Sequence, residues 1–562
     1  MYPTLHSDLD YTKKSDDILG SKGQIQKMGQ SEKNCKHSST KLTRDFFTKV
    51  NIAKLSKTET YVFKNDWILA RILTVMALMI LFFTSFYGII FMWCTNGFNN
   101  ILYSNLIINE GSTNFEIWKN PTVKPITKIY LFNYTNIERY EDGIDKKLNI
   151  EEKGPYVYEE TVERVNATFN GDLVSYQLKR SYRFIPELSK GRQNDIVVVP
   201  NILMLSAAAM HRYSNFFTRL TISSGLNGFY AKAFHSLAAD RFIMGYDDDL
   251  YSLSKKMLKF QNKQPSEKLG LLSKKVGFSP ITYTMHTGLN DINQLGSLKS
   301  INGKDQLDMW STKDCDRVQG TDGTMFSPKT VNRKQPIKIF MPDTCRHFDL
   351  EYKQDNKIFN GDIPSYKYVA SEYLFDSPEN HPNNQCYCEM EGGTCPMQGL
   401  FNTSLCSMGA PTFVSYPHFY RADSRLLESF TGLNPNKTQH ETYLDLHPTL
   451  GFPMNARTRM QINIQVLKTF GFSQLDKLDN ELILPMAWVD MAVEDESLPQ
   501  DIKDLIYTAT YTVAIVKNLL KYGSIIIALI TIIPILANIK YTISNNKRTS
   551  STKSLQKQET DC

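Results

Sequence analysis

The sequence predicts an α+β protein in which one large, strand-dominated domain is held between two membrane-spanning helices. Three observations predict this class. Two long apolar runs without charges lie near the two ends of the chain. Several segments between them alternate apolar and polar residues with the period of a β-strand. Six of the nine cysteines cluster in one part of this middle region.

The composition is that of a globular protein, and the positive charge lies at the two ends. Of the 562 residues, 41% are hydrophobic and 22% are charged, which is too apolar for a disordered chain. Residues 1–71 hold 13 Lys and Arg against 8 Asp and Glu, and residues 540–562 hold 5 against 2. The remainder holds 46 against 48. Because the middle region has no basic excess, we expect no nucleic-acid partner.

Residues 1–71 are expected to form a tail that precedes the first apolar run. Up to about residue 66 the segment is rich in Lys, Ser, Thr and Asp and shows no sustained helical or strand period, so we expect it to be mostly flexible. Tyr2-Pro3-Thr4-Leu5 has the Tyr-x-x-apolar shape of an endocytic sorting signal, although such short patterns often arise by chance.

The first apolar run, residues 72–94, predicts a transmembrane helix. It contains no charged residue, and at about 1.5 Å per residue it extends about 35 Å, enough to cross a bilayer core of about 30 Å. A cleaved signal peptide is excluded by the length of the run and by its distance from the start of the chain.

The second apolar run, residues 523–539, predicts another transmembrane helix. The run is shorter and contains a proline, but Tyr522 and the aliphatic stems of Lys521 and Lys540 extend it, and we take residues 522–539 as the span. A buried helix of a soluble protein is the alternative, and the basic residues directly behind the run disfavour it.

The charges beside the two spans predict the topology. Both tails, residues 1–71 and 540–562, are basic, so the positive-inside rule places them in the cytoplasm. Residues 95–521 then form a domain outside the cell or in an organelle lumen. Four sequons within this domain are expected to carry glycans: Asn133, Asn166, Asn402 and Asn436.

The clustered cysteines have two physical interpretations. They are Cys315, Cys345, Cys386, Cys388, Cys395 and Cys406. Disulfides would staple a loop-rich region, each contributing about 2–4 kcal/mol, whereas a structural zinc site more often uses paired Cys-x2-Cys hairpins. The predicted topology places the cluster where disulfides persist and favours the first interpretation. Spacing alone leaves fifteen pairings open.

The domain between the spans contains signals for both strands and helices. Residues 174–179 and 460–466 alternate with period two and predict half-buried antiparallel strands, and apolar runs at 195–200 and 481–485 predict more buried ones. Apolar residues at helical spacing between Asn201 and Tyr246, interrupted by glycines, predict a helical hairpin or bundle. We see no linker that would divide the domain.

A last helix is predicted before the second span. Ser497 and Gln500 have the spacing of a capping box, and apolar residues follow on one stripe. The stripe comprises Ile502, Leu505, Ile506, Ala509, Val513 and Val516.

Histidines are the candidates for catalysis. His418, His440 and His447 lie near Asp445 and Ser415 in sequence, but neither a Gly-x-Ser-x-Gly nor a His-Glu-x-x-His motif is present. A handful of histidines in a strand-rich domain is usually structural. We therefore expect no catalytic site and no enzyme.

Metal, cofactor and lipid-attachment sites are not expected either. The three aspartates at 247–249 lack the alternating oxygen ligands of a calcium loop, and a capped turn is the simpler interpretation. Cys35 and Cys562 lie too far from the spans for membrane-proximal acylation, so we expect free thiols.

The sequence resembles the class B scavenger receptors, a family that includes the fatty-acid translocase, the lysosomal integral membrane protein and insect sensory neuron membrane proteins. The resemblance covers roughly residues 114–490 and rests on strings in a joint order. These are EKGPYVY at 152–158, MGYD at 244–247, ING at 301–303, GTDG at 320–323, YPHF at 416–419 and GLNPN at 432–436.

The resemblance implies a fold and a disulfide pairing. The family has a large antiparallel β-barrel ectodomain with a helical apex and a lipid-lined tunnel. Its pattern implies that Cys315 pairs with Cys386, Cys345 with Cys406, and Cys388 with Cys395.

One departure concerns the apex. Where the fatty-acid translocase carries two lysines that receive anionic lipid, an ungapped match places Gly228 and Tyr230, and Lys232 is the nearest cation. The family's apical phenylalanine matches Phe217. We therefore expect an apolar ligand-binding rim with one charge, formed by Phe216, Phe217, Phe229, Tyr230 and Lys232.

The function expected from the resemblance is that of a receptor and conduit for lipids. Its partners would be lipids, fatty acids, sterol esters or lipoprotein particles, with a protein ligand at the apex as a further expectation. The alternative is an endolysosomal trafficking receptor for a soluble hydrolase, but the C-terminal tail lacks the acidic dileucine signal of that relative. We expect an integral protein of the plasma membrane, with the lysosomal or endosomal membrane as the alternative.

Overall fold

A computed structural model of the protein describes residues 44–229, 231–260, 265–388 and 395–559. The chain divides into two compact units, one formed by residues 1–81 with 531–562 and the other by residues 82–530. Several residues singled out above lie outside the described part. They are Tyr2, Pro3, Thr4, Leu5, Cys35, Tyr230 and Cys562.

Long helices carry the two apolar runs. The first is α1 (Arg44–Ile89), which continues as a π-helical turn to Cys94, and the second is α13 (Val513–Glu559). Both are long and apolar enough to cross a membrane by length and composition. The expectation of a flexible segment up to residue 66 is wrong from Arg44 onward. No proline or glycine interrupts residues 44–71, so the helix extends upstream of the apolar run.

The predicted capping box before the second span is also wrong. Helix α12 (Gln500–Tyr507) begins at Gln500, with Pro499 at the N-cap position and no side-chain cap. The Ser497 hydroxyl instead donates to the Glu494 carbonyl at 2.7 Å. Of the predicted stripe, Ile506 is buried and Leu505 is exposed. Ser497 lies two residues before the N-cap position, and its hydroxyl bonds to Glu494 instead of to the first turn of the helix.

The remaining helices are short. They are α2 (Gly97–Ser104), α3 (Thr113–Lys119), α4 (Ile137–Glu141), α5 (Ile202–Met210), α6 (Phe216–Gly228), α7 (Ala239–Met244), α8 (Asp249–Phe260), α9 (Lys313–Asp316), α10 (Arg425–Glu428) and α11 (Lys437–His440). At the start of α8 the Asp248 carboxylate accepts a hydrogen bond from the Tyr251 N–H at 2.9 Å, which is the capped turn expected for the three aspartates.

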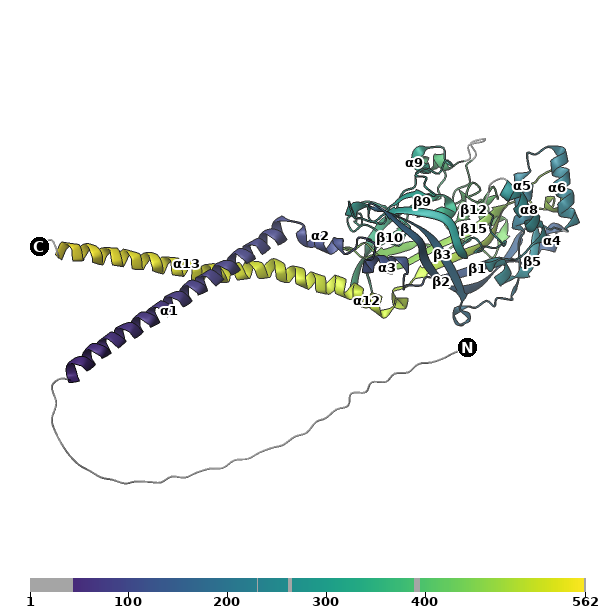
Figure 1. The fold of residues 1–562 in the computed structure, drawn as a ribbon. Helices are drawn as coiled ribbons and strands as arrows, with labels where there is room; N and C mark the ends of the chain where they lie inside the picture. The colour runs from purple at the N-terminus through teal and green to yellow at the C-terminus, as the bar shows by residue number, and fades with distance from the viewer. Residues whose placement is uncertain (1–43, 230, 261–264, 389–394, 560–562) are drawn as a thin grey trace, which may run out of the picture. The chain divides into compact units, whose positions relative to one another are not determined.

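An antiparallel sheet forms the core of the larger unit (Figure 1). Its main path runs β7-β6-β3-β2-β1-β16-β15-β14-β10-β9-β8, with β11, β12 and β13 beside it. The strands are β1 (Ile126–Tyr134), β2 (Leu148–Asn170), β3 (Leu173–Phe184), β6 (Gly277–His286), β7 (Leu298–Ile301), β8 (Ile337–Met341), β9 (Arg346–Ile358), β10 (Ile363–Ala370), β11 (Phe401–Asn402), β12 (Thr412–Ser415), β13 (Phe430–Thr431), β14 (Tyr443–Leu446), β15 (Pro453–Gln465) and β16 (Ile483–Val493). Two further strands, β4 (Ile196–Pro200) and β5 (Phe234–Ala238), form a separate pair.

The sheet is nearly closed into a barrel. Its two end strands, β7 and β8, approach each other through Thr321, which bridges to Ser297 beside β7 and to Ile339 in β8. The Thr321 N–H also donates to the Lys338 carbonyl at 3.0 Å. The predicted combination of a barrel-like antiparallel sheet with terminal apolar helices is confirmed.

The two alternating segments behave differently. In β3, Val174, Tyr176 and Leu178 are buried as predicted. In the second segment Ile464 and Val466 are fully buried as predicted, but Met460 and Ile462 are only half-buried, and the polar Gln461 and Asn463 between them are fully buried. Their amides bond to each other at 2.7 Å and to the Ser415 hydroxyl at 3.0 Å, so neighbouring segments satisfy them.

The helical region between Asn201 and Tyr246 is only partly as predicted. Helices α5 and α6 are present, but Gly225 lies inside α6 and Gly228 at its end, so neither separates the two helices. Strand β5 follows, which helical spacing does not reveal. Helices α5, α6 and α8 lie at the end of the larger unit opposite to α2 and α12 (Figure 1). We call this end the apex.

Three disulfides fasten loops onto the sheet. They join Cys315 to Cys386, Cys345 to Cys406 and Cys388 to Cys395, the pairs that the resemblance implies. Cys386 and Cys388 are buried, and the first of them packs in a core cluster with Trp310 and Tyr387.

Candidate ligand-binding site

An exposed aromatic patch covers the start of α6. Asn215 caps the helix by accepting a hydrogen bond from the Thr218 N–H at 2.9 Å, which places Phe216 and Phe217 in the first turn. Phe217 is 78% exposed. We define the apical aromatic patch as Tyr213, Phe216, Phe217, Leu220 and Phe470, all of them exposed. Contiguous exposed apolar side chains mark interaction surfaces.

Phe470 joins this patch from a distant part of the chain. It lies in the loop between β15 and β16, and its ring centroid is 6.0 Å from that of Phe216. The Thr469 hydroxyl donates to the Ala208 carbonyl of α5 at 2.9 Å and fixes this loop on the apex. Phe470 could not be predicted from the sequence, because a contact with a residue so far away along the chain leaves no local pattern.

The other end of α6 borders an open cleft. Phe229, directly after the helix, and Lys232 both line it, together with residues of α4, α8 and the ends of β1, β4 and β5. The cleft has a volume of about 770 Å³, within the range of small-molecule sites. A 13-residue helix is about 20 Å long, so Phe216 and Phe217 are separated from Phe229 and Lys232. The expected rim therefore consists of two sites.

The cleft carries more acidic than basic side chains. Its cations are Arg139 and Lys232, and Arg139 is already paired with Asp145 at 2.9 Å. Within the described part of the chain no carboxylate lies within 4.0 Å of the Lys232 ammonium. Burial lowers the pKa of His235, so this residue adds no charge at neutral pH. The carboxylates are Glu138, Glu141, Asp248 and Asp249.

Gly228 has room for a side chain. A Cβ atom built there meets no heavy atom within 4 Å, and the backbone does not have the positive φ that disfavours other residues. A lysine could therefore stand at this position without displacing a neighbour.

The core face of the sheet keeps accessible apolar surface. We define it as the face that carries Tyr176 and Leu178, which the strand register extends through β2 and β1 to β16 and β15. On these last strands five apolar side chains of the core face remain half-buried, whereas Ala487 on the same face and Gln461 and Asp490 on the opposite face are buried. The half-buried members are Met460, Ile462, Val489, Met491 and Val493.

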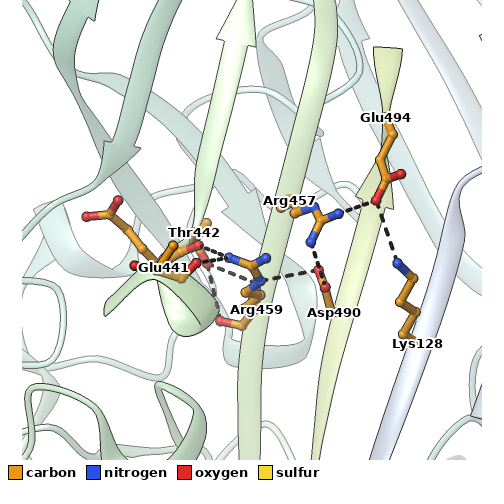
Figure 2. A network of polar contacts seen from close by, with 8 residues as sticks. Lys128, Glu441, Thr442, Arg457, Arg459, Asp490 and Glu494 are labelled. Carbon is orange, nitrogen blue, oxygen red and sulfur yellow. Dashed lines mark hydrogen bonds and ion pairs between the residues drawn. The ribbon is translucent and has the colours of Figure 1, made fainter. Parts of the chain in front are cut away.

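A network of ion pairs occupies the opposite face of the same strands (Figure 2). Asp490 pairs with Arg457 at 3.3 Å and with Arg459 at 3.4 Å. Glu494 bridges Arg457 to Lys128, whose ammonium lies 3.6 Å from its carboxylate. Asp490 and Arg459 are almost completely buried.

The same network holds the segment before β14 on the sheet. The Arg459 guanidinium donates to the Glu441 carbonyl at 2.9 Å, and the Arg459 N–H donates to the Thr442 hydroxyl at 2.9 Å. Figure 2 shows these residues reaching from a neighbouring loop toward β15. Each charged side chain of the network has an ion-pair partner within the protein, and we assign the network a structural role.

The histidines near YPHF are also held by structural contacts. His418 Nε2 lies 2.7 Å from the Glu152 carboxylate, and its Nδ1 accepts from the Asn434 N–H at 3.1 Å. His440 Nδ1 accepts from the Asn436 N–H at 3.0 Å, and burial lowers its pKa to about 4. The two rings stack with centroids 4.8 Å apart.

The remaining candidates for catalysis point to other partners. His447 Nε2 lies 3.0 Å from the Thr510 hydroxyl, and burial lowers its pKa to about 4. The Asp445 carboxylate accepts from the Asn356 amide at 2.9 Å, and the Ser415 hydroxyl donates to the Tyr416 carbonyl at 3.0 Å. These contacts join neither Asp445 nor Ser415 to a histidine.

The four sequons differ in exposure. Asn166 and Asn436 are exposed and Asn402 is half-buried. Asn133 is 8% exposed, and its amide donates to the Glu151 carboxylate at 3.0 Å. We therefore expect Asn133 to be the least readily glycosylated of the four in the folded protein.

Comparisons with known proteins agree on one family. The chain matches the model of the CD36 family over residues 75–538. It is 33% identical over 398 residues to scavenger receptor class B member 1 of Bos taurus, covering 70% of this chain and 76% of the relative. It is 30% identical over 408 residues to lysosome membrane protein 2 of Homo sapiens, covering 72% and 82%. Together with the two apolar helices, these matches make it an integral membrane protein.

Proposed function

Because the chain belongs to the CD36 family of class B scavenger receptors, we propose that it binds lipids or lipoprotein particles at its apex and passes lipid to the membrane along the inside of its barrel. In this proposal both tails face the cytoplasm and residues 95–521 face outward. The plasma membrane is the proposed site of action.

The observation that carries the proposal is the distribution of accessible surface on the sheet. The polar side chains of Gln461, Asn463 and Asp490 are buried, while five apolar side chains of the core face on β15 and β16 stay half-buried. An acyl chain or sterol lying on that face would remove apolar surface from water. This burial would stabilise the bound lipid by about 0.8 kcal/mol per methylene. The core face therefore offers a lipid a path that avoids water.

The apex is proposed to select neutral ligands. The apical aromatic patch supplies apolar contact, and the cleft behind it carries four carboxylates against two cations, one of which is already paired. An anionic head group would be repelled there, whereas a neutral lipid or a protein partner docking on aromatics would not.

Phe217→Ala is expected to weaken binding of a neutral lipid particle by at least about 1 kcal/mol, or about fivefold in Kd, because an exposed aromatic anchor is removed. The matched control is Phe278→Ala, which removes an exposed ring from β6, outside the patch. Binding of synthetic sterol-ester particles to the full-length protein, measured by surface plasmon resonance, checks the prediction. Equal losses for both variants would contradict it.

Gly228→Lys is expected to strengthen binding of anionic lipid particles by about two- to fivefold at low salt, because it places a cation at the position where the fatty-acid translocase carries a lysine. The gain should disappear at high salt, since the charge is exposed. Titration of fatty-acid-loaded particles across a salt series measures it. A steep salt dependence in the wild-type protein that Lys232→Ala abolishes would instead show that the single lysine already governs entry.

A trafficking receptor for a soluble hydrolase is the second candidate. The match to lysosome membrane protein 2 favours it, and the apical aromatic patch would serve a protein ligand as well as a lipid particle. Surface biotinylation of intact cells compared with co-localisation in lysosomes distinguishes the two candidates.

A further inference from the structure

Three cations gather near the end of β3, where Arg180 lies on the core face. Arg180 lies on β3 opposite Gly277, and Lys274 and Lys275 stand three and two residues before that glycine. Two carboxylates accompany them, Glu160 on β2 and Asp343 in the turn Pro342–Thr344 after β8. We call these five residues the inner cationic cluster. Four separate segments of the chain contribute to it.

The register shows on which face of the sheet this cluster lies. Along β3, Arg180 and Tyr182 share the core face with the buried Tyr176 and Leu178. Lys179 lies on the opposite face, where 54% of its side chain is exposed and it pairs with Glu163. Arg180 and Glu160 therefore do not belong to the outer charged surface of the sheet.

The charges within the cluster do not cancel. Arg180 pairs with Glu160 at 3.1 Å, and Lys275 pairs with Asp343 at 2.6 Å. Lys274 is exposed and has no carboxylate within 4.0 Å among the residues that the structure describes. Lys275, with Arg180 and Lys274, keeps the pKa of the Asp343 carboxyl below its usual value, so all three cations lie within electrostatic range of this one carboxylate. One positive charge is left over.

Aromatic surface lies near this cluster, since the pKa of Tyr182 is raised by burial and also by Asp343, on which Lys274 acts. Tyr182 and Phe184 follow Arg180 on the core face, and both are half-buried. The Phe184 ring packs against Tyr158 with centroids 5.3 Å apart. A cluster with an unpaired ammonium and half-buried aromatic rings near it is the arrangement that an amphiphile with an anionic head would match.

We propose that the inner cationic cluster binds the carboxylate or phosphate head of an amphiphilic lipid, with the Lys274 ammonium as its main contact and the acyl chain along Tyr182 and Phe184. This inference rests on the proposed function, because it requires lipid to reach the core face. It adds a chemical class: anionic amphiphiles are recognised inside the barrel, whereas the acidic cleft at the apex disfavours them.

The test compares a C16 fatty acid with its methyl ester, which has the same chain without the charge. Binding to the full-length protein in nanodiscs is measured for the wild type, for Lys274→Gln with Lys275→Gln, and for the control Lys179→Gln on the opposite face of β3. We expect the wild type and the control to prefer the acid by about tenfold, as a charged hydrogen bond commonly provides, and the double variant to bind both equally.

The outcomes separate the inference from the function on which it rests. Failure of the methyl ester to bind any of the proteins would contradict the proposed function itself. Binding of the ester with an unchanged preference for the acid in the double variant would overturn only the inner site. Displacement of the acid by millimolar inorganic phosphate would show a small-anion site and overturn the requirement for a lipid chain, whereas resistance to phosphate supports it.

Discussion

Asp490→Ala is expected to lower the free energy of unfolding by about 3–5 kcal/mol, since it leaves a buried arginine without its counter-ion. Asp490 is 3% exposed and is the carboxylate to which both Arg457 and Arg459 pair (Figure 2). Arg459 is itself buried and cannot turn to solvent. The measurement is the thermal unfolding midpoint of the detergent-solubilised protein, which should fall by about 5 °C or more.

Glu494→Gln is the matched control for this substitution. Glu494 belongs to the same network, but 39% of its side chain is exposed, so water can replace its contacts. We expect a loss of at most about 1 kcal/mol. A comparable fall in the midpoint for both variants would show that burial of the ion pairs does not determine their contribution.

Cys345→Ser is expected to impair folding more than the double change Cys388→Ser with Cys395→Ser. The Cys345–Cys406 bridge closes a sequence separation of 61 residues, whereas Cys388–Cys395 closes only 7. On the chain-entropy model these loops correspond to about 4 and about 2.4 kcal/mol of stabilisation. The backbone carbonyl of Cys345 also accepts a hydrogen bond from the Trp310 indole at 2.7 Å, within a buried cluster.

Retention in the secretory pathway measures this difference. Glycans on Cys345→Ser protein should remain sensitive to endoglycosidase H, while a larger fraction of the double variant should acquire resistant glycans. Stronger retention of the double variant, or mass mapping that finds these thiols reduced in the wild type, would contradict the expectation.

Features of the fold that depend on local sequence could be predicted. The apolar runs stand out because a membrane span needs a continuous uncharged segment, and the alternation in β3 is right because one face packs on the core and the other meets water. In β15 the same reasoning fails. Its polar face is covered by side chains from β12 and the segment before β14, which lie far away in sequence.

The site could be predicted only in part for the same reason. The resemblance located Phe217 and the missing lysines, because these occupy matching positions in a single helix. Neither the cleft nor the inner cationic cluster leaves such a pattern, since each combines short segments that only the folded sheet brings together. Lys274 lies next to Lys275 in the sequence, but nothing there shows that only Lys275 is paired.

The central claim is that lipid travels along the core face, and Met491→Trp tests it most directly. Met491 is half-buried on that face, so replacing its linear side chain by a bulky indole ring should obstruct the path without touching the apex. The control, Ser181→Trp, places the same ring on the exposed opposite face of β3. The measurement is transfer of a labelled sterol ester from bound particles into cells that express each variant. The account predicts normal particle binding for both variants, with transfer lost only for Met491→Trp. Transfer at the wild-type rate with the ring in place would contradict it.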